Sequence, residues 1–163
     1  DAIEGAAQTL RRCAFAIAAV QGLGLGLGFT EQVPEKLGGT APSLRALAPR
    51  APVWGKRTFS ALSDERVRAA LRRRKADHLL LCGLETPVCI YQTAREALAL
   101  DFRVTVLADA ICARRAEDAA TALAAVARAG ADVLPSETVF YGMLGDAGHP
   151  WFREYTKLVK NHA

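Results

Sequence analysis

The pattern of apolar and polar positions predicts a regular alternation of strands and helices over the second half of the chain. Short, purely apolar or alternating runs favour strands, whereas longer stretches with apolar residues three or four apart favour helices. The predicted elements are strands at 78–82, 103–108 and 132–134 and helices at 88–100, 115–129, 136–144 and 151–160. Strands separated by helices of this length indicate βα units and a parallel sheet.

The first half of the chain is less regular. Apolar residues at helical spacing predict a helix over 2–20, and a period-two alternation predicts a strand over about 25–30. The segment 31–49 is rich in proline and glycine and is expected to be a long irregular loop. A short strand at 51–54 follows, and Ser63 is expected to cap the next helix.

Together these elements predict a three-layer α/β/α fold, a doubly wound Rossmann-like parallel sheet with helices on both faces. The length of 163 residues suits one domain over 1–163. Glycines alternate strictly over 22–28, which differs from the GxGxxG pattern of dinucleotide-binding loops. No stretch reaches the roughly 18 consecutive apolar residues of a membrane span, so no membrane partner is expected.

Charge and cysteine spacing narrow the functional classes. The net charge is +4, and much of the excess lies at 72–75, where cations suit the end of a helix. No aromatic residues interleave with them, so no nucleic-acid partner is expected. The four cysteines form no CxxC pair and no ligand spacing with histidine, which argues against a zinc site and favours a reducing, cytoplasmic location.

Cys89 is the strongest candidate for a reactive group. The strand at 78–82 leads through Gly83 into a helical pattern, which places Cys89 between the carboxyl end of a strand and the first turn of a helix. Free backbone N–H groups and the helix dipole favour a thiolate there, and open α/β sheets bind ligands at this edge. The alternative is that Cys89 is a small buried hydrophobic residue.

Lys56 follows the predicted strand at 51–54. If that strand is parallel to the others, Lys56 and Cys89 emerge at the same edge of the sheet, where an ammonium group would stabilise a thiolate or donate a proton. The alternative is an ordinary solvated lysine. The neighbouring Arg57 satisfies the same argument, and the residues alone do not distinguish the two.

The segment Glu85-Thr86-Pro87-Val88-Cys89-Ile90-Tyr91-Gln92-Thr93-Ala94 resembles the nucleophile segment of the isochorismatase-like cysteine hydrolases. Thr30-Glu31-Gln32-Val33-Pro34 is similar to a loop of one branch of that superfamily, and Gly55-Lys56-Arg57-Thr58-Phe59-Ser60 is similar to its lysine motif. Further matches follow in order at 106–110, 136–137 and 146–152, so the resemblance covers nearly the whole chain.

The resemblance implies an Asp–Lys–Cys triad on a Rossmann-like sheet and hydrolysis of a small amide-like C–N bond through a thioester. Carried over, Cys89 is the nucleophile and Lys56 the triad lysine. It also implies a cis peptide bond at Leu84–Glu85 and an oxyanion hole formed by the N–H groups of Glu85 and Cys89. The resemblance further implies a homo-oligomer that acts on a small-molecule substrate.

The sequence departs from the family pattern in two places. The triad acid should end a first strand, but the chain opens at Asp1 in a helical pattern, so the acid is expected upstream of Asp1 or is lacking. Glu31, Glu85 and Asp109 are the nearest acids and are not expected to replace it. No histidine lies between Phe29 and Lys56, where nicotinamidases hold their metal, so no metal or other cofactor is expected.

Two other functions stay open. The missing acid would suit a non-catalytic binding or scaffold protein on the same fold. Cys89 could also act as a redox-sensing thiol, although no resolving partner is evident. The aromatic residues Trp151, Phe152 and Tyr155 either mediate self-association or cover the face of the sheet. His149, in a Gly-His-Pro turn, is expected to be a surface or capping residue.

Overall fold

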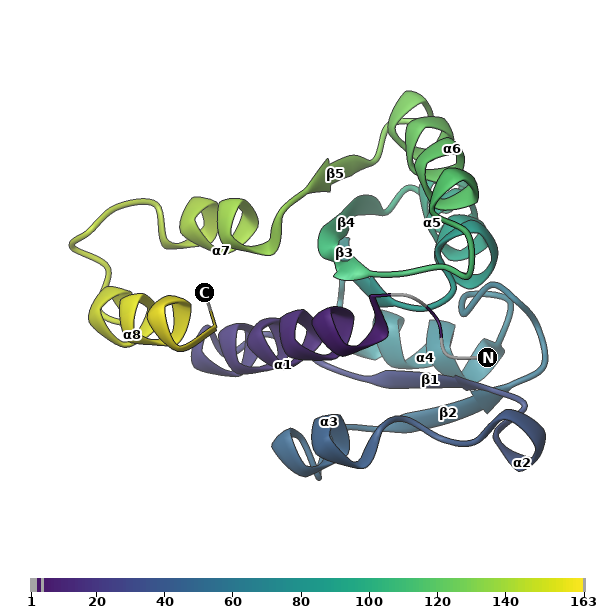
Figure 1. The fold of residues 1–163 in the computed structure, drawn as a ribbon, viewed down its shortest axis with the longest axis horizontal. Coiled ribbons are helices and arrows are strands. Elements are labelled where there is room, and N and C mark those ends of the chain that lie inside the picture. The colour runs from purple at the N-terminus through teal and green to yellow at the C-terminus, as the bar shows by residue number, and fades with distance from the viewer. Residues whose placement is uncertain (1–2, 4, 163) are drawn as a thin grey trace.

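The computed structural model describes residue 3 and residues 5–162. Parallel strands alternate with helices along the chain (Figure 1). The helices are α1 (Ala6–Gly22), α2 (Pro34–Leu37), α3 (Pro42–Leu47), α4 (Glu65–Arg73), the π-helical turn η1 (Thr86–Ile90), α5 (Tyr91–Ala99), α6 (Ala116–Arg128), α7 (Ser136–Leu144) and α8 (Phe152–His162). The strands are β1 (Phe29–Gln32), β2 (Val53–Lys56), β3 (His78–Gly83), β4 (Arg103–Ile111) and β5 (Asp132–Leu134).

In the first half of the chain, the first strand starts later than predicted and the predicted loop contains helices. β1 begins at Phe29 rather than near Leu25, because its pairing with β2 starts at Phe29 opposite Val53, and the chain turns at Leu23 and Gly24 before it. Gly24 has a φ of 68°, a conformation that glycine adopts without a steric cost. The expected loop over 31–49 contains the short helices α2 and α3, each begun by a proline, whose fixed φ suits the first helical position.

Several element boundaries also shift. The start of the helix predicted over 2–20 falls partly on residues 1, 2 and 4, outside the described residues, and α1 continues to Gly22. Asp64, not Ser63, caps α4, and its carboxylate accepts a hydrogen bond from the Arg66 N–H at 2.9 Å. β2 extends to Lys56, so the lysine is the last residue of the strand rather than part of the following loop.

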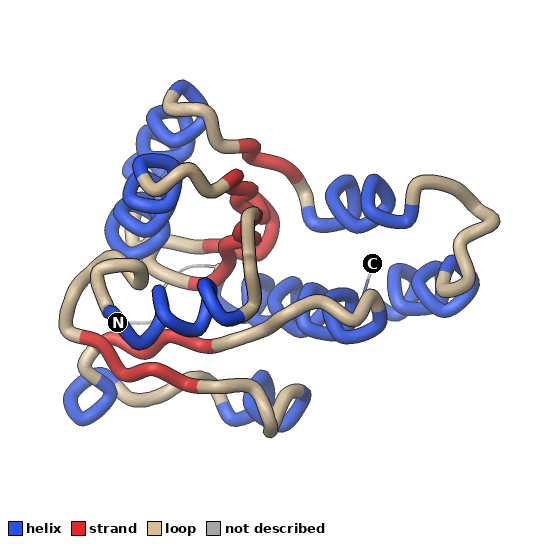
Figure 2. Tube along the Cα trace, turned by 180° about the vertical axis from the view of Figure 1, so that it is seen from behind, coloured by secondary structure: helices blue, strands red, loops and turns tan. Residues whose placement is uncertain are grey.

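All strand pairs are parallel, as predicted, and the fold is α/β with helices on both sides of its sheets. The strands form two groups instead of one continuous sheet, β1–β2 and β3–β4–β5. Both views show the β1–β2 pair set apart from the other three strands (Figures 1 and 2). Within the described part of the chain, β1 and β3 are not hydrogen bonded to each other.

β4 lies between two hydrophobic cores. Leu107 and Ala110 face a core made with α1, α7 and α8, whereas Val104 and Val106 face one made with α4, α5 and α6. Four consecutive residues of β4, 104–107, are 0–3% exposed, as expected for a strand covered on both faces. The two cores make this strand the centre of the layered structure.

The C-terminal aromatic residues belong to the first of these cores. Tyr155 is fully buried, and its ring lies against those of Phe15, Phe140 and Trp151. Phe152 packs against the same cluster. These rings therefore contribute to the packing of this chain, and Trp151 and Phe152 remain half-buried.

Asp109, near the end of β4, bonds directly to residues of α1 and α7 and is linked to α8 through Arg12. Its carboxylate accepts hydrogen bonds from the Ser136 N–H at 2.8 Å and the Ser136 hydroxyl at 2.7 Å. The Arg12 guanidinium donates to the same carboxylate at 2.6 Å and to the His162 carbonyl at 3.3 Å. Burial raises the pKa of Asp109, but these donors outweigh it and hold the pKa below its ordinary value.

We expect Asp109→Asn to lower the free energy of unfolding at pH 7 by about 1–3 kcal/mol, because it removes charge-assisted hydrogen bonds. A depressed carboxyl pKa contributes stability above the unfolded-state pKa of about 3.9 and loses it as the pH falls through the folded-state value. Urea unfolding at pH 7 and pH 3 should therefore show a smaller loss of stability on acidification in the variant. An equal loss in both proteins would contradict this role.

Candidate active site

The parallel pairing of β1 and β2 brings Gln32 and Lys56 together. Each is the last residue of its strand, and the two are register partners, so their side chains leave the same edge of the sheet. Lys56 is only 5% exposed. Its Nζ donates to Gln32 Oε1 at 2.7 Å and to the carbonyls of Thr58 and Phe59, both at 2.9 Å. These three acceptors satisfy a charge that would otherwise be costly to bury.

Cys89 lies in η1, the π-helical turn that joins β3 to α5. The helix expected from residue 88 thus begins earlier and with a wider first turn. Thr86 anchors that turn, since its N–H and its hydroxyl both donate to the Cys112 carbonyl beyond β4, at 3.0 and 2.9 Å. The half-buried Cys89 Sγ lies 3.7 Å from Lys56 Nζ and 3.9 Å from Gln32 Oε1.

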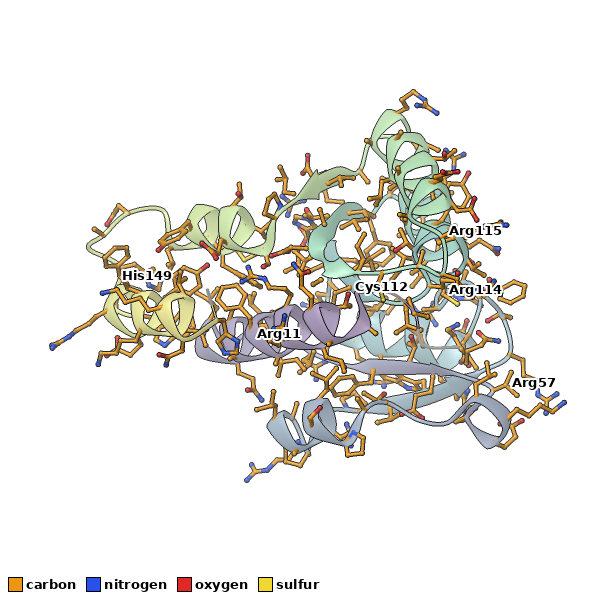
Figure 3. All side chains as sticks on the ribbon, viewed as in Figure 1. Arg11, Arg57, Cys112, Arg114, Arg115 and His149 are labelled. Atoms are coloured by element: carbon orange, nitrogen blue, oxygen red, sulfur yellow. The ribbon has the colours of Figure 1, made fainter. Side chains whose placement is uncertain are left out.

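The structure separates Lys56 from Arg57, which the sequence left interchangeable. Lys56 points inward to Cys89, whereas the Arg57 side chain is 84% exposed and pairs with Glu35 at 3.2 Å. Figure 3 shows Arg57 projecting at the edge of the molecule. Lys56 is therefore the cation that faces the thiol.

Glu85 occupies the loop between β3 and η1. The peptide bond Leu84–Glu85 is cis, as the resemblance implied. The Glu85 carboxylate accepts hydrogen bonds from Arg114 Nε at 3.1 Å and from the Arg114 N–H at 3.2 Å. Within the described part of the chain, the Glu85 N–H has no hydrogen-bond acceptor, which leaves it available to a ligand.

The acids considered as substitutes for the triad acid are engaged elsewhere. Glu31 accepts a hydrogen bond from the Thr40 N–H at 2.8 Å, Glu85 is held by Arg114, and Asp109 is held by Arg12 and Ser136. Over residues 3 and 5–162, no acid contacts Lys56 Nζ or Cys89 Sγ. The described site is therefore a lysine, a cysteine and a glutamine.

The described residues contain no group of three or more His, Cys, Asp or Glu side chains that could hold a metal ion. His149 lies at the opposite end of the molecule from Arg57 (Figure 3). Its Nδ1 accepts a hydrogen bond from the Trp151 N–H at 3.1 Å, beside the start of α8. This contact is the expected capping role.

Gln32 is the site residue to which the sequence analysis assigned no role. The segment 30–34 resembles a loop of the family, and the alternation of apolar residues predicts a strand over 25–30 that ends before Gln32. The parallel register of β1 with β2, with Gln32 opposite Lys56, is the signal that identifies it.

A lysine and a cysteine meeting at the carboxyl ends of parallel strands define a candidate hydrolase site on a Rossmann-like fold. The profile of the isochorismatase domain matches residues 1–138, and the chain belongs to this family. Isochorismatase domain-containing protein 2 of Bos taurus is 38% identical over 133 residues, which cover 80% of this chain. Those residues span 63% of that relative's length.

Two solved structures have the same fold. The MAR1 ribonuclease of Caenorhabditis elegans superposes with a TM-score of 0.91 at 30% identity, over 97% of this chain and 81% of that one. The YcaC gene product of Escherichia coli, an octameric hydrolase of unknown specificity, has a TM-score of 0.83 at 20% identity, over 99% and 85% of the two chains. Within the described residues, no helix is long and apolar enough to cross a membrane.

We expect iodoacetamide to alkylate Cys89 first at pH 6, ahead of the exposed Cys82 and the buried Cys13 and Cys112. The cation 3.7 Å from the sulfur attracts the negative charge that the sulfur carries as it reacts. Replacing it in Lys56→Met should slow alkylation of Cys89 about tenfold or more. Peptide mapping after a timed pulse measures both rates. Arg57→Met is the matched control, because Arg57 faces away from the site, and equal slowing in both variants would contradict a local effect of Lys56.

Proposed function

We propose that this protein is a cysteine hydrolase that cleaves a small amide-like C–N bond through a thioester on Cys89. The observation that supports it best is the contact of Cys89 Sγ with the buried Lys56 Nζ at 3.7 Å. A buried cation beside a cysteine at the carboxyl edge of parallel strands is an arrangement that activates nucleophiles. Membership of the isochorismatase domain family agrees with this chemistry.

In the proposed reaction, the Cys89 thiolate attacks the carbonyl carbon and forms a C–S bond. The C–N bond then breaks, and the amine leaves with the proton that came from the thiol. Water attacks the resulting thioester, so that the carboxylic acid departs and the thiol is restored. Lys56 stabilises the thiolate by its charge and steadies the negative oxygen that develops at each step.

The oxyanion is proposed to bind to the N–H groups of Glu85 and Cys89. Both groups lie on the segment between β3 and α5, and Arg114 fixes the Glu85 carboxylate on that segment. One such donor contributes about 3–4 kcal/mol to lowering a barrier in well-studied hydrolases. The segment that carries the nucleophile would thus also supply the donors.

Proton transfer needs a carboxylate that the described residues do not place beside Cys89. The family resemblance assigns it to an aspartate at the end of a preceding strand, and our proposal includes that aspartate. The other hydrogen-bond partners of Glu31, Glu85 and Asp109 argue against this role for them. We further propose that residues 1–163 belong to a single domain, that the protein forms a cytoplasmic homo-oligomer, and that it uses no metal and no cofactor.

A panel of small primary amides and carbamates, assayed for ammonia release, tests the proposal. We expect one or more compounds to be hydrolysed, and Cys89→Ala to reduce the rate at least 10³-fold because covalent catalysis is lost. Cys82→Ala, an exposed thiol, is the matched control and should keep its activity. RNA is tested separately, for strand cleavage rather than ammonia release, because one structural neighbour is a ribonuclease.

Two results would contradict this proposal. Amide hydrolysis that persists in Cys89→Ala would exclude Cys89 as the nucleophile. Absence of hydrolysis across the panel, with an unreactive Cys89, would favour a binding or scaffold protein on the same fold.

A further inference from the structure

Gln32 is held in one orientation at the centre of the candidate site. Its Nε2 donates to the Arg57 carbonyl at 2.8 Å, which fixes the amide so that Oε1 faces inward. That oxygen accepts from Lys56 Nζ at 2.7 Å and lies 3.9 Å from Cys89 Sγ, within reach of the S–H donor. The negative end of the amide dipole therefore points at both reacting groups.

The Lys56 ammonium has three protons, and three oxygens accept them at 2.7–2.9 Å. Two of these oxygens are backbone carbonyls of Thr58 and Phe59, and the third belongs to Gln32. The sulfur of Cys89, at 3.7 Å, is a fourth and longer contact. Gln32 is thus the one side-chain acceptor among the three, and it competes with the sulfur for the ammonium.

We propose that Gln32 is a positioning residue that restrains the nucleophile: it accepts the Cys89 S–H and occupies an ammonium proton that a thiolate would otherwise take. This inference rests on the proposed function, in which Lys56 and Cys89 react together. A carbonyl oxygen beside the sulfur disfavours a thiolate, because the two negative ends repel. In the resting site, the Gln32 oxygen therefore opposes the attraction between the Lys56 ammonium and a negative sulfur.

Several charged groups on the segments around the site are paired. On the segment before η1, Glu85 is bound by Arg114, and beyond β2, Arg57 pairs with Glu35. At the start of α6, which packs against η1, Asp118 pairs with Arg115 at 2.6 Å. Among the described residues, Lys56 is the charged group that contacts Cys89 Sγ. Substitution of Gln32 therefore tests one local interaction.

The experiment is the pH–rate profile for iodoacetamide alkylation of Cys89 in the full-length protein and its variants. Gln32→Met removes the hydrogen-bond acceptor and keeps a side chain of similar size. The midpoint of its pH–rate profile should fall by about one pH unit, so that alkylation of Cys89 at pH 6 is about tenfold faster. Gln32→Glu keeps the shape but adds a negative charge, which offsets Lys56, so its midpoint should rise by about one unit. Gln21→Met is the matched control, since the Gln21 side chain donates to the Leu47 carbonyl and, among the described residues, contacts neither Lys56 Nζ nor Cys89 Sγ.

Opposite shifts in the two Gln32 variants, with no shift in Gln21→Met, support the restraint. Unchanged or equally slowed alkylation in both Gln32 variants overturns it, and if Lys56→Met still slows alkylation, the proposed function is unaffected. If Cys89 is alkylated no faster than Cys82 and its rate does not change in Lys56→Met, both the restraint by Gln32 and the proposed hydrolase function are contradicted. Thermal unfolding of each variant checks its fold, and the nearly isosteric Gln32→Glu keeps the test decisive if Gln32→Met is unstable.

Discussion

Because an ammonium group withdrawn from water must find oxygen acceptors, the burial of Lys56 constrains every segment around it. Its three acceptors come from the end of β1 and from the loop after β2, and its fourth contact is Cys89 in η1, just before α5. The ends of two separate groups of strands thus converge on one side chain. The register that sets Gln32 opposite Lys56 makes this convergence possible.

The packing of β4 is the second constraint on the site. Its two faces are buried against different helices, and Cys112, the residue after its carboxyl end, supplies the carbonyl that fixes Thr86 and hence the turn carrying Cys89. Asp109, two residues before the end of that strand, ties α1, α7 and the C-terminal helix to it. The scaffold and the candidate site therefore share one strand, although Asp109 and Cys89 do not touch.

The parallel α/β architecture and the position of Cys89 follow from apolar periodicity, which is strong where buried strands alternate with amphipathic helices. The first half was harder to predict, since the alternation over 25–30 resembles a longer strand although pairing with β2 begins only at Phe29. Lys56 could be placed near the edge but not distinguished from Arg57, because only the pairing of β2 determines which of two neighbours points inward. The role of Gln32 depends on the orientation of a side-chain amide, which no spacing encodes.

The central claim is that Cys89 forms a covalent bond to the acyl group of its substrate. Rapid acid quenching during turnover of a hydrolysed amide, followed by peptide mass spectrometry, tests it directly. The account predicts the acyl mass on the peptide that contains Cys89, removable by hydroxylamine as expected of a thioester. Turnover with no acyl adduct under any quench time, or with the adduct on another residue, would contradict it.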